Sequence, residues 1–419
     1  MIKSKMYFYI RMELLSPMSI GNGDDFLTKH DCIRNSQGKP FIPGTTLAGV
    51  FSHYLSEEQK EIFTPKLSGD YKQSPFFISD ANVYLENKQD FISTNIRDGV
   101  KLDENKTTVK SAKFDFEVVE TGTKFDFRIE VILRDNDDSS KIKNVVDVIL
   151  NGLDKGEILL GYKSKRGYGK VKLLEVRIKE FEKEQVEELL DFNKYDINSY
   201  KNYQMASISN QNRYDYIKVD LKQLGGISIR KYSAKAGEVD FEHITSNGKP
   251  VIPGTSWNGL IKRQILEYLK NDLIHNSGVI LADWFGKEKS KEQKAFASNI
   301  IVEESTINNA KKIDLTRNKI DRFSGGAADR ALFSESAYFN GYTCLGIKVK
   351  KSIKQDNDNS RIIGLIALVI KDIDNGLVAL GGQTSIGRGL FKVENVTLNG
   401  EKLDLDNAIS KILGGVADE

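Results

Sequence analysis

The sequence KPFIPGTTLAGVF at 39–51 is nearly repeated as KPVIPGTSWNGLI at 249–261, 210 residues further along the chain. An internal repeat constrains the fold more than any single motif, because both copies have to fold by the same local rules. Each copy follows a stretch of alternating apolar and polar residues, YFYIRMELL at 7–15 and YIKVDLKQL at 216–224, which is typical of a half-buried strand. The chain is therefore predicted to be a tandem duplication.

The two halves keep the same order of features after the repeat. Each half predicts a long protruding hairpin (99–119 and 317–338), a strand, an apolar helix, a short strand, a glycine-rich loop and a final strand. This order is the βαββαβ plan of ferredoxin-like or RRM-like domains. We therefore predict an α+β fold with two tandem ferredoxin-like domains, 1–183 and 214–419, joined by a polar linker at 184–213.

The repeated I-P-G-T segment predicts the start of a helix in each half. The proline requires an extended approach, the glycine permits an unusual backbone angle, and the following Thr or Ser is expected to cap the helix. The residues concerned are Pro43, Gly44, Thr45 and Thr46 in the first half and Pro253, Gly254, Thr255 and Ser256 in the second. The apolar stripes that follow are expected to pack in the core.

The glycine-rich loops GYKSKRGYGK at 161–170 and GGQTSIGRGL at 381–390 align without gaps. A dinucleotide-binding loop or P-loop is excluded, because the glycines are expected between two strands and not before a helix. A plain hairpin turn and a cradle of backbone N–H groups for RNA phosphates both stay open. The first loop favours the cradle, because aromatic and basic side chains alternate in it. These are Tyr162, Lys163, Lys165, Arg166, Tyr168, Lys170 and Lys172, whereas the second loop has only Arg388 and Lys392.

Composition excludes several classes of protein. Lys and Arg total 61 against 59 for Asp and Glu, so the net charge of +2 does not indicate a nucleic-acid partner by itself. The two cysteines, Cys32 and Cys344, lie far apart and the four histidines form no paired motif, which predicts neither a disulfide nor a zinc site. No apolar run is long enough to span a membrane, and the N-terminus alternates like a strand instead of resembling a signal peptide. A cytoplasmic protein without membrane partners is predicted.

Taken in this order, the features resemble the RAMP superfamily of CRISPR-associated proteins. The matching segments are SPMSIGNGDD after the first strand, the two I-P-G-T helix starts, FFISDANV, RDGVKLDENKTTVKSAKFDFEVVETGTKFDF and both glycine-rich loops. The similarity covers both halves and is greatest to the backbone subunits of type III effector complexes, here as two fused repeats. It implies an RNA-binding subunit of an antiviral complex, whose partners are the CRISPR guide RNA, the target RNA and other effector subunits. The resemblance also implies that the two hairpins are thumbs, at 92–116 and 308–333, that push between bases.

The resemblance also implies which residues face the guide backbone. They are Gly44, Thr45, Thr46, Gly161, Lys163, Lys165, Arg166, Gly167, Tyr168 and Gly169 in the first half, and Gly254, Thr255, Ser256, Gly381, Gly382, Gly387, Arg388 and Gly389 in the second. Specificity would come from base pairing between guide and target, while the protein reads the shape of the backbone.

Subunits of this family that cut the target carry an essential aspartate between the first strand and the I-P-G-T turn, and Asp31 in LTKHDCIRN matches it. A carboxylate there can hold a divalent metal ion, Mg²⁺ or Mn²⁺, near the scissile phosphate, or orient the attacking 2′-hydroxyl. Asp24 and Asp25 lie close in sequence, and His30 is a candidate acid or base. The resemblance therefore implies an endoribonuclease site at Asp31.

In the second half, the spacing to I-P-G-T allows either Asp240 or Glu242 as the equivalent residue. Glutamate departs from the family pattern, so Asp240 is the second candidate catalytic residue. Two other functions stay open. The same scaffold can bind and assemble RNA without cleaving it, and then needs no cofactor. A stand-alone endoribonuclease that processes CRISPR precursor RNA has a similar doubled fold and commonly uses a histidine, for which His30 and His53 are candidates.

Overall fold

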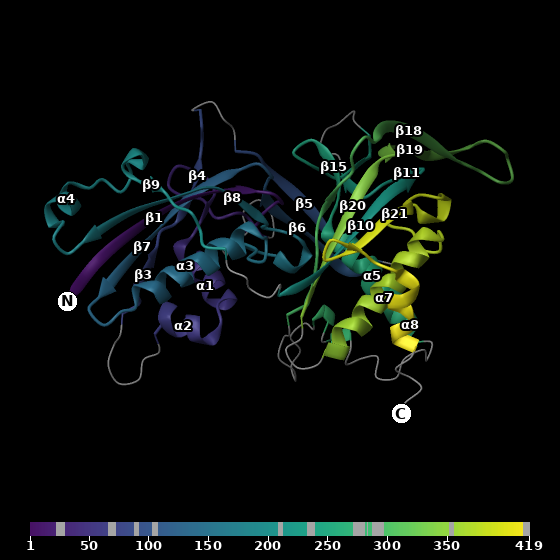
Figure 1. The fold of residues 1–419 in the computed structure, drawn as a ribbon. Coiled ribbons are helices and arrows are strands. Elements are labelled where there is room, and N and C mark those ends of the chain that lie inside the picture. The colour runs from purple at the N-terminus through teal and green to yellow at the C-terminus, as the bar shows by residue number, and fades with distance from the viewer. Residues whose placement is uncertain are drawn as a thin grey trace. The chain divides into compact units, whose positions relative to one another are not determined.

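The structure, a computed structural model, describes residues 1–21, 30–65, 73–87, 92–102, 108–207, 213–232, 239–270, 281–282, 284–286, 297–351 and 356–413. The chain forms two compact units (Figure 1). The first unit comprises Met1–Lys101, Thr108–Ser164 and Tyr168–Gln211, and the second comprises Leu102–Thr107, Lys165–Gly167 and Asn212–Glu419.

The first unit contains the predicted long strands and helices in the predicted order, together with several shorter elements. Its strands are β1 (Ile2–Leu14), β2 (Phe41–Ile42), β3 (Phe76–Ile78), β4 (Ala81–Tyr84), β5 (Thr94–Leu102), β6 (Thr108–Val119), β7 (Lys124–Arg134), β8 (Val171–Glu182) and β9 (Lys201–Asn202). Its helices are α1 (Gly44–Tyr54), α2 (Glu57–Phe63), α3 (Ser139–Asp154) and α4 (Val186–Asp191), with the 3₁₀ turn η2 (Ile197–Ser199). The 3₁₀ turn η1 (Ser164–Arg166) begins in this unit at Ser164. Helices α1, α2 and α3 lie on one face of the sheet (Figure 1).

The main sheet of this unit has the strand order β2-β4-β7-β1-β8-β9, and β3 also pairs with β7. Each of these strand pairings is antiparallel. The β3–β4 segment, β7, β1 and β8 thus lie side by side in the order of a ferredoxin-like βαββαβ domain. The predicted α+β fold class is confirmed.

Alternating hydrophobic residues explain why these strands form and which face they bury. Every second residue of β7 is buried, as expected for a strand with one face in the core. Residues Met6, Phe8 and Ile10 of β1 join the same core, against the apolar face of α3. The buried residues of β7 are Phe125, Phe127, Ile129, Val131 and Leu133.

The opposite face of the first sheet is covered by the segment that was expected to be a linker. Tyr7 and Tyr9 of β1 point to this face and both are buried. The ring centroid of Phe192 lies 5.1 Å from that of Tyr7, and the ring centroid of Tyr200 lies 6.2 Å from that of Tyr9. Strand β9 then pairs with β8 at the sheet edge. The sheet face on which RRM proteins stack bases is therefore covered in this unit.

The second unit repeats the plan. Its strands are β10 (Tyr214–Leu224), β11 (Gly226–Ile227), β12 (Arg230–Tyr232), β13 (Phe241–His243), β14 (Thr245–Ser246), β15 (Lys249–Ile252), β16 (Ile300–Val302), β17 (Ser305–Thr306), β18 (Lys311–Ile320), β19 (Ala327–Phe339), β20 (Tyr342–Lys350), β21 (Leu390–Leu398) and β22 (Glu401–Lys402). Its helices are α5 (Gly254–Lys270), α7 (Asp356–Asp374) and α8 (Leu405–Leu413), with the 3₁₀ turn η3 (Thr384–Ile386). The sheet order β16-β20-β10-β21-β22 matches that of the first unit, again with antiparallel pairing.

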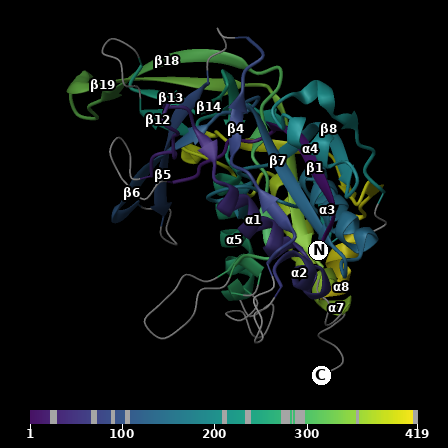
Figure 2. The ribbon, with the colours of Figure 1, turned by 90° about the vertical axis from the view of Figure 1, so that its left-hand side faces the viewer.

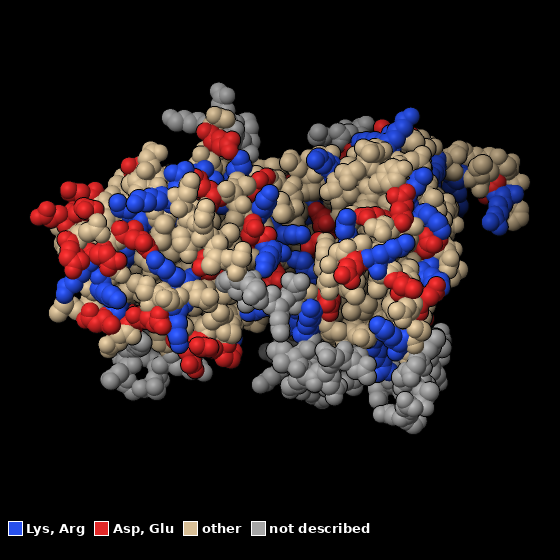
Figure 3. Space-filling view, viewed as in Figure 1, with Lys and Arg blue, Asp and Glu red and all other residues tan. Residues whose placement is uncertain are grey.

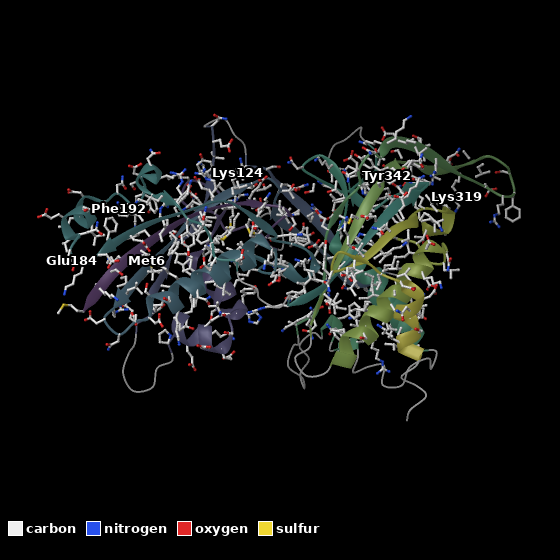
Figure 4. The ribbon with its side chains drawn as sticks, in the orientation of Figure 1. Met6, Lys124, Glu184, Phe192, Lys319 and Tyr342 are labelled. Carbon is white, nitrogen blue, oxygen red and sulfur yellow. The ribbon has the colours of Figure 1, made fainter. Side chains whose placement is uncertain are left out.

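Both predicted hairpins form. Strands β5 and β6 make a separate two-stranded sheet, and β18 pairs with β19 from Lys311↔Phe339 to Ile320↔Ala327. The β18–β19 hairpin reaches beyond the sheet and helices of its own unit (Figures 1 and 2), and Lys319 lies far out along it (Figure 4). Residues 103–107, at the tip of the first hairpin, lie outside the described residues.

The short strands predicted before the glycine-rich loops, at 157–160 and 377–380, are wrong. One backbone bond joins each segment to the end of its loop, from Leu160 N to Gly169 O and from Leu380 N to Gly389 O, both 2.9 Å long, while Ile158 N and Leu377 N donate back to the preceding helix. Gly169 and Gly389 adopt left-handed angles, with φ of 73° and 76°, which turns the chain out of strand register. The glycines therefore lie between a helix and a strand.

The predicted cap of the first repeated helix is also wrong. Pro43 is the N-cap of α1, and the N–H of Gly44 donates to Oδ1 of Asp80 at 2.7 Å instead of the helix being capped by its own Thr. Gly44 has no left-handed backbone angle. A Cβ atom on Gly44 would lie 2.5 Å from the carbonyl oxygen of Ile78, so the close approach of β3 is what requires glycine here.

Candidate nucleic-acid interface

The first glycine-rich loop (161–170) is anchored to the segment that follows β1. The N–H of Tyr162 donates to the carbonyl of Ser19 at 2.7 Å, and the N–H of Gly169 donates to the carbonyl of Pro17 at 2.9 Å. Gly161 and Gly169 both have left-handed backbone angles. A Cβ on Gly169 would lie 1.7 Å from the carbonyl oxygen of Leu160, so no other residue fits there.

The second glycine-rich loop (381–390) has the same construction. The N–H of Gly382 donates to Ser228 O at 2.8 Å, and the N–H of Gly389 donates to Gly226 O at 2.9 Å. Gly381, Gly387 and Gly389 have left-handed backbone angles, as do their counterparts Gly161, Gly167 and Gly169. The chain therefore builds one anchored loop twice, and neither copy is a plain hairpin turn.

In the first unit the base of the β5–β6 hairpin packs against this loop. Tyr168 is 2% exposed, and its ring centroid lies 5.8 Å from that of Phe116. The Nζ atom of Lys163 lies 3.7 Å from the Phe116 centroid and 4.2 Å from the Phe114 centroid. Burial lowers the pKa of Lys163 to about 8. The ring of Tyr162, in contrast, is exposed.

In the second unit an ion pair replaces the aromatic pair. Val119 of the first hairpin pairs with Met18, and Tyr338 of the second hairpin pairs with Ile227. Val119 and Tyr338 are therefore equivalent, and so are the residues three positions before them, Phe116 and Glu335. The gap-free alignment of the loops gives Arg388 the place of Tyr168.

Glu335, 1% exposed, is surrounded by arginines. Its Oε1 lies 2.6 Å from Nη2 of Arg388 and 3.3 Å from Nη2 of Arg317, and its Oε2 lies 3.9 Å from Nη2 of Arg230. Burial lowers the pKa of Arg388, and the neighbouring Glu335 opposes this effect. The predicted RNA contacts Tyr168 and Arg388 are thus both buried and hold the hairpin base to the loop.

Asp31, the candidate catalytic residue, lies beside this hairpin base and is 8% exposed. The N–H of Glu117 in β6 donates to the carbonyl of His30 at 3.0 Å, and the N–H of Cys32 donates to Oε2 of Glu117 at 2.9 Å. Arg34 also donates to Glu117, at 2.5 Å. Glu117 directly follows Phe116 in β6. The hydrogen bonds of Glu117 therefore hold the segment of Asp31 next to the contact between Phe116 and Tyr168. The His30 and Tyr162 ring centroids are 5.4 Å apart.

The second half places Glu242, and not Asp240, at the position that corresponds to Asp31. The bond from Ile33 N to Ile20 O recurs as the bond from Ile244 N to Ile229 O, and Glu242 precedes Ile244 by two residues as Asp31 precedes Ile33. This register corrects the choice that was made from spacing alone.

The side chain of Asp240 is exposed, and its Oδ2 accepts a hydrogen bond from the N–H of Ser334, in the middle of β19, at 2.7 Å. Glu242 forms an ion pair with Lys312 of β18, with Oε1 of Glu242 3.6 Å from Nζ of Lys312. In the second half, Asp240 and Glu242 thus both bind residues of the β18–β19 hairpin.

Among the described residues no group of three or more His, Cys, Asp or Glu side chains is arranged to hold a metal ion. Asp24 and Asp25 lie outside the described part of the chain. A magnesium ion is usually held by one or two carboxylates together with phosphate oxygens of the substrate, so Asp31 alone fits such an ion only when RNA supplies the other ligands.

The remaining predicted RNA contacts lie on separate segments. Gly44, Thr45 and Thr46 form the first turn of α1 beside Asp80, and Gly254, Thr255 and Ser256 form the first turn of α5. Lys165, Arg166 and Gly167 belong to the second compact unit. On the face shown in Figure 3, basic and acidic side chains are interspersed over each unit, which fits the small net charge.

Sequence reasoning missed three residues of the site. Phe114 and Phe116 carry the contact with Lys163, and Glu117 holds the segment of Asp31. The alternation in FDFE was a signal for a strand, but it could not tell which loop that strand contacts.

A model of the RAMP superfamily matches residues 11–172 and again residues 226–392. Since the two matches cover more than half of the chain, the chain belongs to the RAMP superfamily, and the predicted resemblance over two repeats is confirmed. As a member of this superfamily it is a CRISPR-associated RNA-binding protein. A comparison with curated proteins gives no match. Throughout the described residues, every helix is too short or too polar to cross a bilayer.

Proposed function

We propose that this chain is a guide-RNA-binding backbone subunit of a type III CRISPR effector complex, and that Asp31 contributes metal-dependent cleavage of the target RNA. In this role the chain binds the guide RNA through both halves and assembles with other effector subunits. Pairing between guide and target supplies the sequence specificity, because the protein contacts the backbone.

One observation carries this proposal. The same anchored glycine-rich loop recurs in both halves, each time packed against the base of a long hairpin. A repeated element of this kind suits a repeated ligand such as a nucleic-acid backbone, which presents equivalent phosphates along its length. A single small-molecule site gives no reason to build the loop twice.

The cleavage part of the proposal rests on the place of Asp31. The loop, the hairpin base and the segment of Asp31 meet within the first unit, through Glu117 on one side and His30 on the other. A carboxylate that is shielded from water attracts a cation more strongly than an exposed one does. RNA lying along the loop would bring phosphate oxygens to the ion that Asp31 holds.

A second candidate function is the same scaffold without cleavage. The observation that favours it is the burial of Asp31, which leaves only 8% of this residue exposed. An RNA-binding and assembly subunit requires the loops and hairpins but no accessible carboxylate.

The experiment is to express the chain with its effector partners, sequence the RNA that copurifies, and then add a complementary target RNA with Mg²⁺ or Mn²⁺. Guide RNAs of defined length support the backbone role, and their absence contradicts it. Asp31→Asn should abolish target cleavage while the guide RNA still copurifies. Asp240→Asn is the matched control, because its carboxylate accepts a hydrogen bond from the backbone of Ser334 in β19.

Loss of cleavage in Asp31→Asn alone supports catalysis at Asp31. Unchanged cleavage in that variant refutes it and leaves the non-catalytic scaffold. Cleavage of precursor RNA by the chain without partners would instead indicate a processing enzyme, which Asn substitution of His30 would test.

A further inference from the structure

Three aromatic side chains of the first unit surround the end of a lysine, and together they are called the aromatic cage. They are Phe114 and Phe116 of β6 and Tyr162 of the first glycine-rich loop. The Nζ atom of Lys163 lies 3.7, 4.2 and 5.3 Å from the centroids of Phe116, Phe114 and Tyr162. The cage therefore holds a cation that belongs to the chain itself.

The backbone of the loop, and not the cage, sets the position of Lys163. Its φ of 56° is left-handed, and Gln383 at the same place in the second loop has a φ of 59°. The contact with the rings attracts the ammonium group, but the group loses water of hydration there, and burial lowers the pKa of Lys163 accordingly. A lysine on a flexible aliphatic chain can leave such a contact without a change in the backbone.

The cage has the properties of a stacking site for an RNA base. Tyr162 is 45% exposed, whereas Phe116 is 2% exposed and has Lys163 above its ring. Aromatic rings beside a basic groove stack unpaired bases of any sequence. The cage lies next to the segment of Asp31, since Glu117 follows Phe116 and binds the backbone of Cys32.

The second unit has no equivalent cage within its described residues. Glu335 takes the place of Phe116, and the uncharged Gln383 takes the place of Lys163. Both halves have the anchored glycine-rich loop, but the side chains that pack on the loop differ between them.

We propose that the aromatic cage is a stacking site for one unpaired RNA base, and that Lys163 fills the cage until the base displaces its ammonium group. The displaced ammonium group then pairs with a phosphate of the bound strand. This inference rests on the RNA-binding function proposed above and adds to it the class of ligand that the first half takes at one position.

The test measures the affinity of the full chain for a single-stranded RNA and for a set of RNAs that each lack one base. In the wild-type chain one abasic position should weaken binding, by roughly 5-fold to 150-fold, which is the usual effect of one stacked base. Tyr162→Ala should weaken binding of the intact RNA and remove the penalty at that one position. Tyr162→Phe, which keeps the ring, should behave as the wild type does. Tyr195→Ala is the control for loss of an exposed tyrosine elsewhere, since Tyr195 is 66% exposed.

The role of Lys163 is read from the dependence of affinity on salt. Lys163→Ala should reduce the slope of log affinity against log salt by about one ion, because one phosphate contact is lost. Tyr162→Ala should reduce the slope by a similar amount, because without a stacked base Lys163 stays in the cage and makes no phosphate contact. An unchanged slope in Lys163→Ala overturns the displacement of the ammonium group.

The outcomes separate this inference from the proposed function. If the wild-type chain binds no RNA, the proposed function fails and the inference fails with it. If the chain binds RNA but Tyr162→Ala keeps every abasic penalty of the wild type, only the stacking site is refuted. Circular dichroism of Tyr162→Ala checks that the fold is kept.

Discussion

Exchanging the buried ion pair of the second half for the aromatic pair of the first tests whether the two contacts occupy equivalent positions. The perturbations are Glu335→Phe, Arg388→Tyr and the double variant, which copies Phe116 and Tyr168. In the wild type, the side chain of Glu335 is 1% and that of Arg388 5% exposed, and their charged atoms are 2.6 Å apart. Each single variant breaks this pair, whereas the double variant removes both charges.

The expected magnitudes follow from the burial and the neighbours of each charge. Removing one partner of a buried ion pair costs about 3–5 kcal/mol, because the other charge is left without compensation. Glu335→Phe should lie at the upper end, since it leaves Arg388 buried near two further guanidinium groups. Arg388→Tyr should lie at the lower end, since Arg317 stays 3.3 Å from Glu335. The double variant should differ from the wild type by less than about 2 kcal/mol or be more stable, as for hydrophobic replacements of buried pairs.

Tryptophan fluorescence during urea unfolding measures these differences in the second unit alone. Both tryptophans of the chain, Trp257 and Trp284, are buried there. With a urea slope of about 3 kcal/mol per M, a loss of about 3 kcal/mol lowers the midpoint by about 1 M. Arg322→Tyr, at an exposed site on the hairpin, is the control and should change stability by less than about 0.5 kcal/mol.

Non-additivity is the decisive result. A double variant that is much more stable than the sum of the two single effects supports the equivalence of the contacts. A double variant that is as unstable as the sum would refute the reasoning, because two aromatic side chains would then not fit where the ion pair lies.

Three further predictions concern single residues. Gly169→Ala should destabilise the first unit by more than about 1 kcal/mol, because the new Cβ would lie 1.7 Å from Leu160 O. Gly38→Ala, at a similar left-handed φ (72° against 73°) but with open space around it, should cost less stability in thermal unfolding followed by circular dichroism. Burial lowers the pKa of His243 to about 4, so the unfolded chain binds a proton first as the pH falls below about 6.5; the unfolding free energy measured by tryptophan fluorescence should fall by up to about 1.4 kcal/mol per pH unit between those values, and the variant His243→Gln, which has no titrating group there, should show a smaller slope. NMR of methylated lysines should show one resonance with a midpoint near about 8 that is missing in Lys163→Arg, and a full set of midpoints near 10.5 would contradict the burial of this ammonium group.

The sequence by itself determined the duplication, the fold class and the places of the main helices and strands. These depend on local patterns, such as the alternation of Phe125, Phe127 and Ile129 in β7 and the repeated I-P-G-T helix starts. A strand or an amphipathic helix is specified by the spacing of its own apolar residues, so the pattern can be read without knowing what packs on it.

Only the tertiary structure decided how the glycines and the segment 184–203 are used. Gly44 is required by the approach of β3, and the aromatic residues of the expected linker cover Tyr7 and Tyr9 of the first sheet. Both facts depend on residues that are distant in sequence, and no local pattern specifies which surface a segment covers.

The candidate site shows the same division. The sequence indicated Asp31 and both glycine-rich loops, but the spacing favoured Asp240 where the hydrogen-bond register places Glu242. Counting residues back from the I-P-G-T motif fails when the loops of the two halves differ in length, although the strands still pair in the same register. Equivalent residues therefore have to be identified from the hydrogen bonds of the folded backbone. The contacts of Phe116 in one half and Glu335 in the other lie about fifty residues from their loop partners, and packing across that separation is set by the tertiary fold.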